Sequence, residues 1–167
     1  MVKRNNTTDH HANLFLLVPI LFIVHNFEEA LTMAEWSQKV PEFIHPQVTS
    51  FQFSIAVTLL SVIGVAATVL AKHLFRGRYF VNIMCGFSAI SFMNAFFPHI
   101  IAAVYFKSYV PGLLTSIFLY LPFCWYAFFK VLGSRMIEKK DFILSFIIGT
   151  VSGVVLAKFA LFVGGQF

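Results

Sequence analysis

Residues 18–36 read VPILFIVHNFEEALTMAEW, an apolar run interrupted by His25, Asn26, Glu28 and Glu29. A helix needs about 20 consecutive, mostly apolar residues to cross the hydrocarbon core of a bilayer. The histidine and the two carboxylates fall within that length, where an ionised group is costly and usually belongs to a functional site. The stretch therefore predicts both a membrane helix and a candidate site on that helix.

The composition of the whole chain is that of a membrane protein. Of its 167 residues, 59% are hydrophobic and only 11% are charged, and the mean hydropathy is +0.82. Soluble domains carry about 25% charged residues. The 22 phenylalanines suit helices that face lipid on several sides. The length favours a single domain over residues 1–167.

Five apolar segments are long enough to cross a membrane, and polar or turn-forming pieces separate them. Because lipid offers no partner for backbone groups and the runs lack alternating polarity, the segments must be helical. We therefore expect an all-α fold, a polytopic transmembrane bundle of five spans. The spans are about 13–35, 50–72, 79–105, 110–131 and 142–164.

The basic residues between the spans predict the orientation of the chain. One set of connections holds nine of them: Lys3, Arg4, Lys72, Arg76, Arg78, Lys130, Arg135, Lys139 and Lys140. The other set holds only Lys39 and Lys107. By the positive-inside rule, the N-terminus lies inside and the C-terminus outside, in a multi-pass protein of the cytoplasmic membrane. Since these charges stand at the ends of apolar runs, we expect no nucleic-acid partner.

The polar residues within the spans are predicted to lie at similar depths. At 1.5 Å per residue, Glu28 lies about 22 Å above the start of its span, and Asn94 lies about 22 Å above the start of the third. Thr115 and Lys158 reach the same outer half of the bilayer on the fourth and fifth spans. Such a shared layer is typical of a polar chamber, because buried charges need partners.

The spacing on the first span favours metal ligation. Residues three and four apart share a helix face, so Glu28 and Glu29 flank His25 at about 60° and 40°. One imidazole and at least one carboxylate can then address a single point. Whichever carboxylate is not a ligand could act as a general base or orient His25. His99 is the candidate third ligand, because Pro98 is expected to kink the third span and turn His99 inward.

Four other residues are assigned to the same chamber. Asn94 is a candidate ligand or substrate hydrogen-bonding group, Lys158 could balance the carboxylates or bind an anion, and Thr115 and Tyr109 are candidate substrate contacts. Simpler interpretations stay open. Glu28 could pair with Lys158 only for stability, His99 could face headgroups, Lys158 could extend to the surface, and Tyr109 could be an interface anchor.

These residues also resemble a known family. His25-Asn26-Phe27-Glu28-Glu29 is similar to the signature of the HXXEE family of small bacterial membrane proteins. Asn94, His99 and Tyr109-Val110-Pro111-Gly112 with Thr115 fit the same pattern, which covers the first four spans. The resemblance implies that these positions define the family's site, and it implies no particular reaction.

The function expected from the sequence is an intramembrane, metal-dependent enzyme of hydrolase or isomerase type. It would act on a lipid or apolar small molecule in the outer half of the bilayer. A divalent metal, zinc more than iron, would be held by His25, by Glu28 or Glu29, and by His99. The alternatives are a small transporter or a permeation unit for ions or protons, for which an oligomer is an option, and a membrane ligand-binding or immunity protein.

Overall fold

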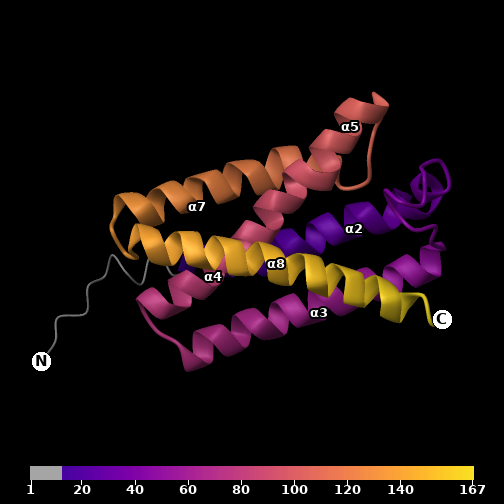
Figure 1. The fold of residues 1–167 in the computed structure, drawn as a ribbon. Coiled ribbons are helices and arrows are strands. Elements are labelled where there is room, and N and C mark those ends of the chain that lie inside the picture. The colour runs from indigo at the N-terminus through magenta and orange to yellow at the C-terminus, as the bar shows by residue number, and fades with distance from the viewer. Residues whose placement is uncertain (1–12) are drawn as a thin grey trace, which may run out of the picture.

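The computed structural model describes residues 13–167, and all regular structure within that range is helical (Figure 1). The longer helices are α2 (Val18–Ser37), α3 (Ser50–Leu74), α4 (Arg78–Asn94), α7 (Leu121–Gly133) and α8 (Lys139–Gly164). Short elements extend them: η1 (Phe15–Leu17), η2 (Ala95–Ile100), α5 (Ile101–Phe106), α6 (Leu113–Thr115) and η3 (Ser116–Tyr120).

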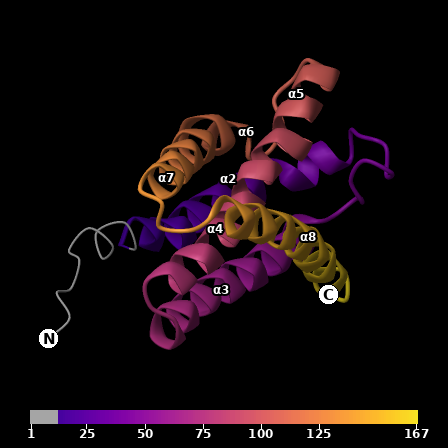
Figure 2. The ribbon, with the colours of Figure 1, turned by 60° about the vertical axis from the view of Figure 1, so that its left-hand side comes forward.

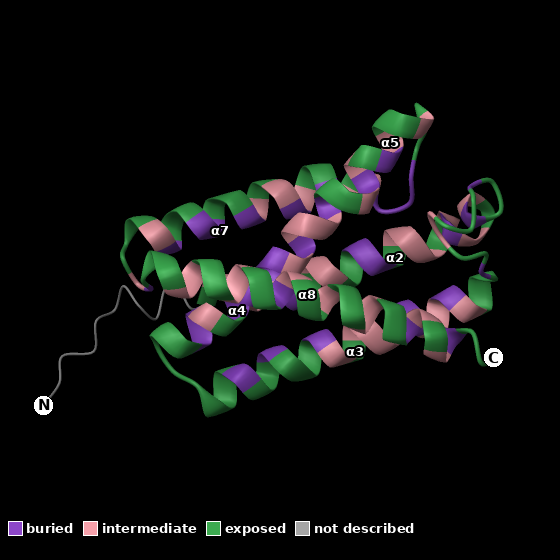
Figure 3. Cartoon of the chain, viewed as in Figure 1, coloured by how far each residue is buried: buried purple, intermediate pink, exposed green. Residues whose placement is uncertain are grey.

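The short elements join the longer helices into five continuous segments that are long and apolar enough to cross a membrane. They run over Phe15–Ser37, Ser50–Leu74, Arg78–Phe106, Leu113–Gly133 and Lys139–Gly164. The all-α class and the five membrane-length helices expected from the sequence are thus confirmed. Apolar side chains on the outer faces are exposed, most evenly along α8 (Figure 3), as lipid contact requires.

The connections that carry most of the basic residues lie at one end of the bundle. Figure 1 shows the α3–α4 and α7–α8 connections together at that end, and the α2–α3 and α5–α6 connections at the other. Lys3 and Arg4, which also entered the predicted orientation, lie outside the described residues. The orientation of the chain across a membrane stays a prediction.

Helix α8 lies across α4 and α3, and α3 also packs against α2 (Figure 2). Small residues allow the closest of these approaches. A Cβ at Gly149 would overlap the backbone of Gly86, and a Cβ at Gly153 would lie 2.5 Å from Ile90 Cγ2. Small residues four apart let two helix backbones come together, which is a common device where lipid removes the hydrophobic drive for association.

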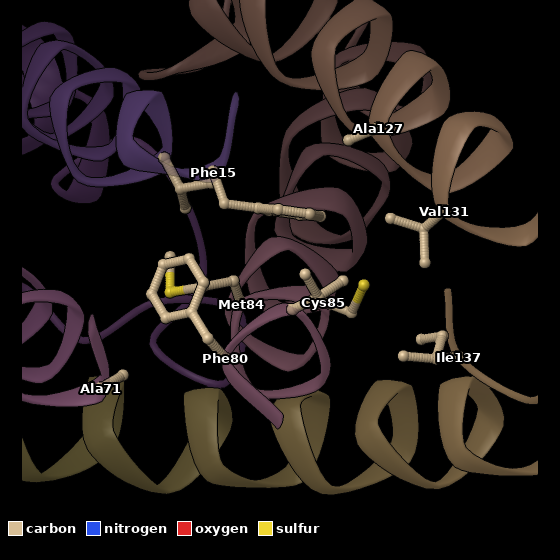
Figure 4. Close-up of a cluster of buried hydrophobic side chains, with 10 residues drawn as sticks. Phe15, Ala71, Phe80, Met84, Cys85, Ala127, Val131 and Ile137 are labelled. Atoms are coloured by element: carbon tan, nitrogen blue, oxygen red, sulfur yellow. The ribbon is translucent and has the colours of Figure 1, made fainter. Parts of the chain in front are cut away.

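An apolar cluster fills the end of the bundle where the α3–α4 and α7–α8 connections lie. Figure 4 shows side chains from η1, α3, α4, α7 and the α7–α8 connection meeting there. Phe15, Val81 and Ala127 are fully buried in this cluster. A polar tie adds to the packing between α2 and α3, because Asn26 Nδ2 donates to Val57 O at 3.3 Å and to Ser61 Oγ at 2.9 Å.

The third membrane-length segment is broken where the sequence predicts a kink. Phe97, in η2, has an extended backbone (φ −129°, ψ 114°), and Pro98 follows it. Proline removes one helical hydrogen bond and clashes with the preceding turn. As a result Asn94 and His99, which would point about 140° apart on a regular helix, are within hydrogen-bonding distance. The predicted inward turn of His99 is therefore confirmed.

Candidate metal centre

His25, Glu29 and His99 form a cluster at the junction of α2 and η2. Glu29 Oε1 lies 3.6 Å from His25 Nε2 and 3.3 Å from His99 Nε2. The three potential ligand atoms all lie within 4.8 Å of one another. Both imidazoles are fully buried, and 13% of the Glu29 side chain is exposed. Two residues four apart on one helix and a third from the kinked segment therefore face one point.

Two of the three ligand separations in this cluster are those expected of a tetrahedral metal site. Zinc bonds to nitrogen and oxygen of about 2.0–2.1 Å, at tetrahedral angles, separate neighbouring ligand atoms by about 3.4 Å. The two separations that involve Glu29, 3.6 and 3.3 Å, are close to that value, and the two imidazole ligand atoms lie within 4.8 Å of each other. Two histidines and one carboxylate are a ligand set used by catalytic zinc and by non-haem iron. The donor set can therefore hold a divalent metal.

Asn94 bridges the two imidazoles. Its Nδ2 lies 3.1 Å from His25 Nε2 and 2.9 Å from His99 Nε2. An amide NH₂ group has two hydrogens, so it can donate to both rings at once. In that arrangement each Nε2 lone pair accepts from Asn94 and each ring carries its proton on Nδ1, which for His99 has no hydrogen-bond partner among the described residues. This is the tautomer that ligation through Nε2 requires, although the amide must turn away before either Nε2 can bind a metal.

A second contact gives His25 the same tautomer. Its Nδ1 lies 2.7 Å from Thr115 Oγ1, and that hydroxyl donates to Gly112 O at 3.3 Å. Because the hydroxyl hydrogen goes to the carbonyl, the oxygen is free to accept a hydrogen bond from His25 Nδ1. Outer hydrogen bonds of this kind orient a ligating histidine and raise its basicity. Thr115, predicted as a substrate contact, here positions His25.

The backbone of Gly112 covers the cluster. Its φ of +77° lies in the left-handed region that favours glycine. A Cβ at this position would lie 2.7 Å from Cε1 of both His25 and His99, and 3.0 Å from Glu29 Cγ. Sequence reasoning placed this glycine only in a family pattern and assigned it no role. Its contact with the site depends on how the loop folds back over the two rings.

Tyr120 forms the wall of the site on the side of η3. Its ring centroid lies 4.5 Å from that of His25, at an angle of 33°, and the residue is almost completely buried. Sequence reasoning missed Tyr120, because an aromatic residue in an apolar span gives no signal of its own. The nearest signal was its depth, since Tyr120 lies five residues beyond Thr115 on the same span.

Glu28 lies outside the cluster and binds the start of the fourth membrane-length segment. Its Oε1 accepts from the Tyr109 hydroxyl at 2.6 Å and from Leu114 N at 3.0 Å, and its Oε2 accepts from Thr115 N at 2.7 Å. The first N–H groups of a helix lack partners within that helix, and a carboxylate there is favourable. The sequence left open which carboxylate is the ligand, and the geometry places Glu29 in the cluster and Glu28 at this helix end.

Tyr109 lies in the loop between the third and fourth segments and contacts Glu28 alone among the predicted site residues. Burial and the neighbouring Glu28 carboxylate raise the pKa of its phenol to about 12. Together, Tyr109 and Glu28 fix the loop whose far end, Gly112, covers the imidazoles. The predicted role of Tyr109 as a substrate contact stays a prediction.

A cavity of about 770 Å³ adjoins the cluster, with walls contributed by α2, α3, α4 and α8. Most of its lining is apolar. Glu29, Asn94 and Lys158 are among its polar residues. Pockets for small molecules span about 300–1,000 Å³. The cavity therefore differs from the predicted polar chamber: its walls are mostly apolar, because aliphatic and aromatic side chains of four helices line it, and its polar groups are few.

Lys158 contributes to this cavity and makes no ion pair with any residue in the range 13–167 that the structure describes. The simpler interpretation, in which Glu28 pairs with Lys158 to stabilise the bundle, is therefore not what the structure contains. Glu28 has three other partners, and they lie on the loop and the fourth segment.

The fold and this cluster define a class: a small helical protein with five membrane-length helices and a buried His/Glu cluster beneath the loop between α5 and α6. Residues 16–127 match the model of a family described as proteins of unknown function with an HXXEE motif. The chain is 33% identical over 133 residues to the uncharacterized protein YrkK of Bacillus subtilis (strain 168), which covers 80% of this chain and 82% of that protein. No solved structure matches the chain. The chain therefore belongs to the HXXEE family.

His25 and Glu29, the first and last residues of the HXXEE signature, face the same cluster, whereas Asn26 and Glu28 face other segments of the chain. His25 and Glu29 lie four residues apart on one helix face and meet in the cluster. Glu28 projects toward the α5–α6 loop and the start of α6, and Asn26 projects toward α3. The signature thus combines two candidate ligands with two residues that hold neighbouring segments in place.

Proposed function

We propose that this protein is an intramembrane, metal-dependent enzyme of hydrolase type that acts on a lipid or another apolar molecule. The observation that carries the proposal is that Glu29 and Asn94 belong both to the His/Glu cluster and to the wall of the apolar cavity. A molecule in that cavity would lie against the candidate ligands. The proposal also rests on the donor set, whose spacing suits zinc.

Each residue of the site has a role in this proposal. His25, His99 and Glu29 would hold the metal, which supplies a Lewis acid and an activated water. Thr115 keeps the proton of His25 on Nδ1, and Gly112 closes the site on the loop side. Asn94 can rotate its amide to donate a hydrogen bond to a substrate oxygen. The apolar walls exclude bulk water, which strengthens every electrostatic contact inside.

The test is metal analysis of the purified protein beside paired variants. We expect about one zinc per chain after zinc loading, and loss of that zinc in His25→Ala and in Glu29→Gln. His73→Ala and Glu35→Gln are the matched controls, because both residues lie outside the cluster on α3 and α2. Absence of zinc from the loaded wild-type protein, or its retention in both cluster variants, would refute the metal centre.

The catalytic part of the proposal needs a separate measurement. The protein would be reconstituted with mixed bacterial lipids, and the lipids would be analysed by mass spectrometry before and after incubation. A hydrolase releases a product that depends on zinc and is missing in Glu29→Gln. If the zinc-loaded protein leaves all lipids unchanged while ions or protons cross the vesicles, the transporter alternative replaces the enzyme.

We also propose that the chain lies in the cytoplasmic membrane with the α3–α4 and α7–α8 connections inside. The support is the shared end of those two basic connections (Figure 1) and the positive-inside rule. A membrane-impermeant maleimide should label Ser108→Cys in intact cells, and Ser134→Cys only after permeabilisation. The native cysteines are both buried and should give little background. The reverse labelling pattern would overturn this topology.

A further inference from the structure

The register of α4 against α8 places Lys158 at the depth of the His/Glu cluster. The two helices run parallel, and Gly149 lies against Gly86 while Gly153 lies against Ile90. Continuing four residues on each helix brings Asn94 opposite residue 157. Lys158 is the next residue, and it lines the same cavity as Asn94. Lys158, whose side chain is exposed, therefore lines the cavity close to the level of the candidate metal centre.

The charge of Lys158 has no counterpart within the described part of the chain. No carboxylate there forms an ion pair with it, and beyond the first turn of α8 it is the one charged residue of that helix. A lysine within a membrane span is expensive unless it is paired or reaches water. Glu29, which lines the same cavity, already directs its Oε1 at both imidazoles. An anion supplied from outside the chain would complete the pairing.

The rest of the cavity suits a single apolar chain. Its lining along α4 extends from Tyr79 and Asn82 to Asn94, and 12 residues of helix from Asn82 cover about 18 Å. The facing walls are mostly aliphatic residues and glycines of α3 and α8. This shape is long and apolar, with charged groups near one end.

We propose that the cavity binds a single-chain amphiphile with an anionic group, a carboxylate or a phosphate. The apolar chain lies between α3, α4 and α8, and the anionic group pairs with Lys158. In that position the part of the ligand next to its charge lies beside Glu29 and Asn94. That this ligand is also the substrate rests on the proposed function, whereas its binding does not.

The experiment compares four sixteen-carbon probes by native mass spectrometry of the protein in neutral detergent. Hexadecanoate and hexadecyl phosphate are anionic, hexadecanol is neutral and hexadecyltrimethylammonium is cationic. We expect both anionic probes to bind about tenfold more tightly than the alcohol, as for a charged hydrogen bond in a partly buried site. The tighter of the two identifies a fatty acid or a phospholipid product as the source. Equal binding of the anionic and neutral probes overturns the proposal.

Two pairs of variants locate the binding. Lys158→Met should remove the preference for anionic probes and leave hexadecanol unchanged, while Lys158→Arg should retain the preference. Ala67→Phe should weaken all four probes because Ala67 lines the cavity. Ala66→Phe is its control, because the neighbouring alanine is equally exposed and lies outside the lining. An anionic preference that survives in Lys158→Met overturns the assignment to Lys158.

The same samples separate this inference from the proposed function. His25→Ala should lose zinc and still bind hexadecanoate through Lys158. If the wild-type protein shows no preference for anionic probes while Lys158→Met still binds zinc, the amphiphile proposal alone is refuted. Anionic binding without any zinc would sink the metal-dependent enzyme alone.

Discussion

Replacing Gly112 by alanine tests whether the α5–α6 loop is part of the candidate metal centre. The added methyl group would lie 2.7 Å from a carbon of each imidazole and 3.0 Å from Glu29 Cγ. These contacts are too short, so the rings or the loop must move. Forcing a methyl into a packed site costs about 1–3 kcal/mol. If that cost falls on the metal-bound geometry, zinc affinity drops about fivefold to over a hundredfold.

The matched control is Gly77→Ala. Gly77 also has a positive φ, +56°, but a Cβ there meets nothing within 4 Å. Both variants carry backbone strain of about 1 kcal/mol or more, so both should melt at a lower temperature. Only Gly112→Ala should lose zinc affinity, measured by competition with a fluorescent chelator. If both variants bind zinc as the wild-type protein does, the loop does not define the site and this reasoning fails.

Three further predictions concern the residues around the cluster. Thr115→Val should weaken zinc binding about 10- to 100-fold, because it removes the acceptor for His25 Nδ1, while Thr115→Ser should retain the affinity. Glu28→Gln should lower the free energy of unfolding by about 1–3 kcal/mol, because three hydrogen bonds lose their charge, with zinc still bound at one per chain. Tyr109 should ionise only near pH 12 in an ultraviolet absorbance titration, compared with Tyr109→Phe. Because its pKa is raised above the ordinary value of about 10, its contribution to stability is complete below about pH 10 and is lost as the pH rises through 12.

Each of these has an outcome that contradicts it. Equal zinc affinities for the valine and serine variants at position 115 would mean that the hydroxyl does not orient His25. Loss of zinc in Glu28→Gln would make Glu28 a ligand, whereas the exposed Glu42→Gln should change neither stability nor zinc. An absorbance step near pH 10 that is smaller in Tyr109→Phe than in the wild-type protein would show that Tyr109 ionises normally and does not donate to Glu28.

The sequence predicted the five membrane-length helices and the residues on which the candidate site is built. Helix length and hydropathy are local properties of the chain, so a bilayer-spanning segment is legible without knowing its neighbours. The spacing of His25 and Glu29 was equally local, because four residues bring two side chains to one helix face. Pro98 allowed His99 to be predicted as the third ligand, because the kink that a proline causes in the preceding turn does not depend on tertiary contacts.

The tertiary structure decided how these residues divide their roles. Glu28 and Glu29 are adjacent and chemically identical in the sequence. They differ only because one faces the helix start at Thr115 and the other faces the two imidazoles. Gly112 and Tyr120 gave no interpretable signal, because their contact with His25 depends on a loop and a helix more than 80 residues away in the chain.

Lys158 shows the same division most clearly. Its depth follows from counting residues along the fifth span, but the choice among pairing with Glu28, reaching the surface or facing a cavity was open. The close approach of α4 and α8 at Gly86 and Gly149 brings Lys158 into the lining of the same cavity as Asn94, with its side chain exposed. Local spacing therefore determined which residues belong to the polar layer. The packing of the helices, which depends on all five at once, determined which of them meet and what kind of space they enclose.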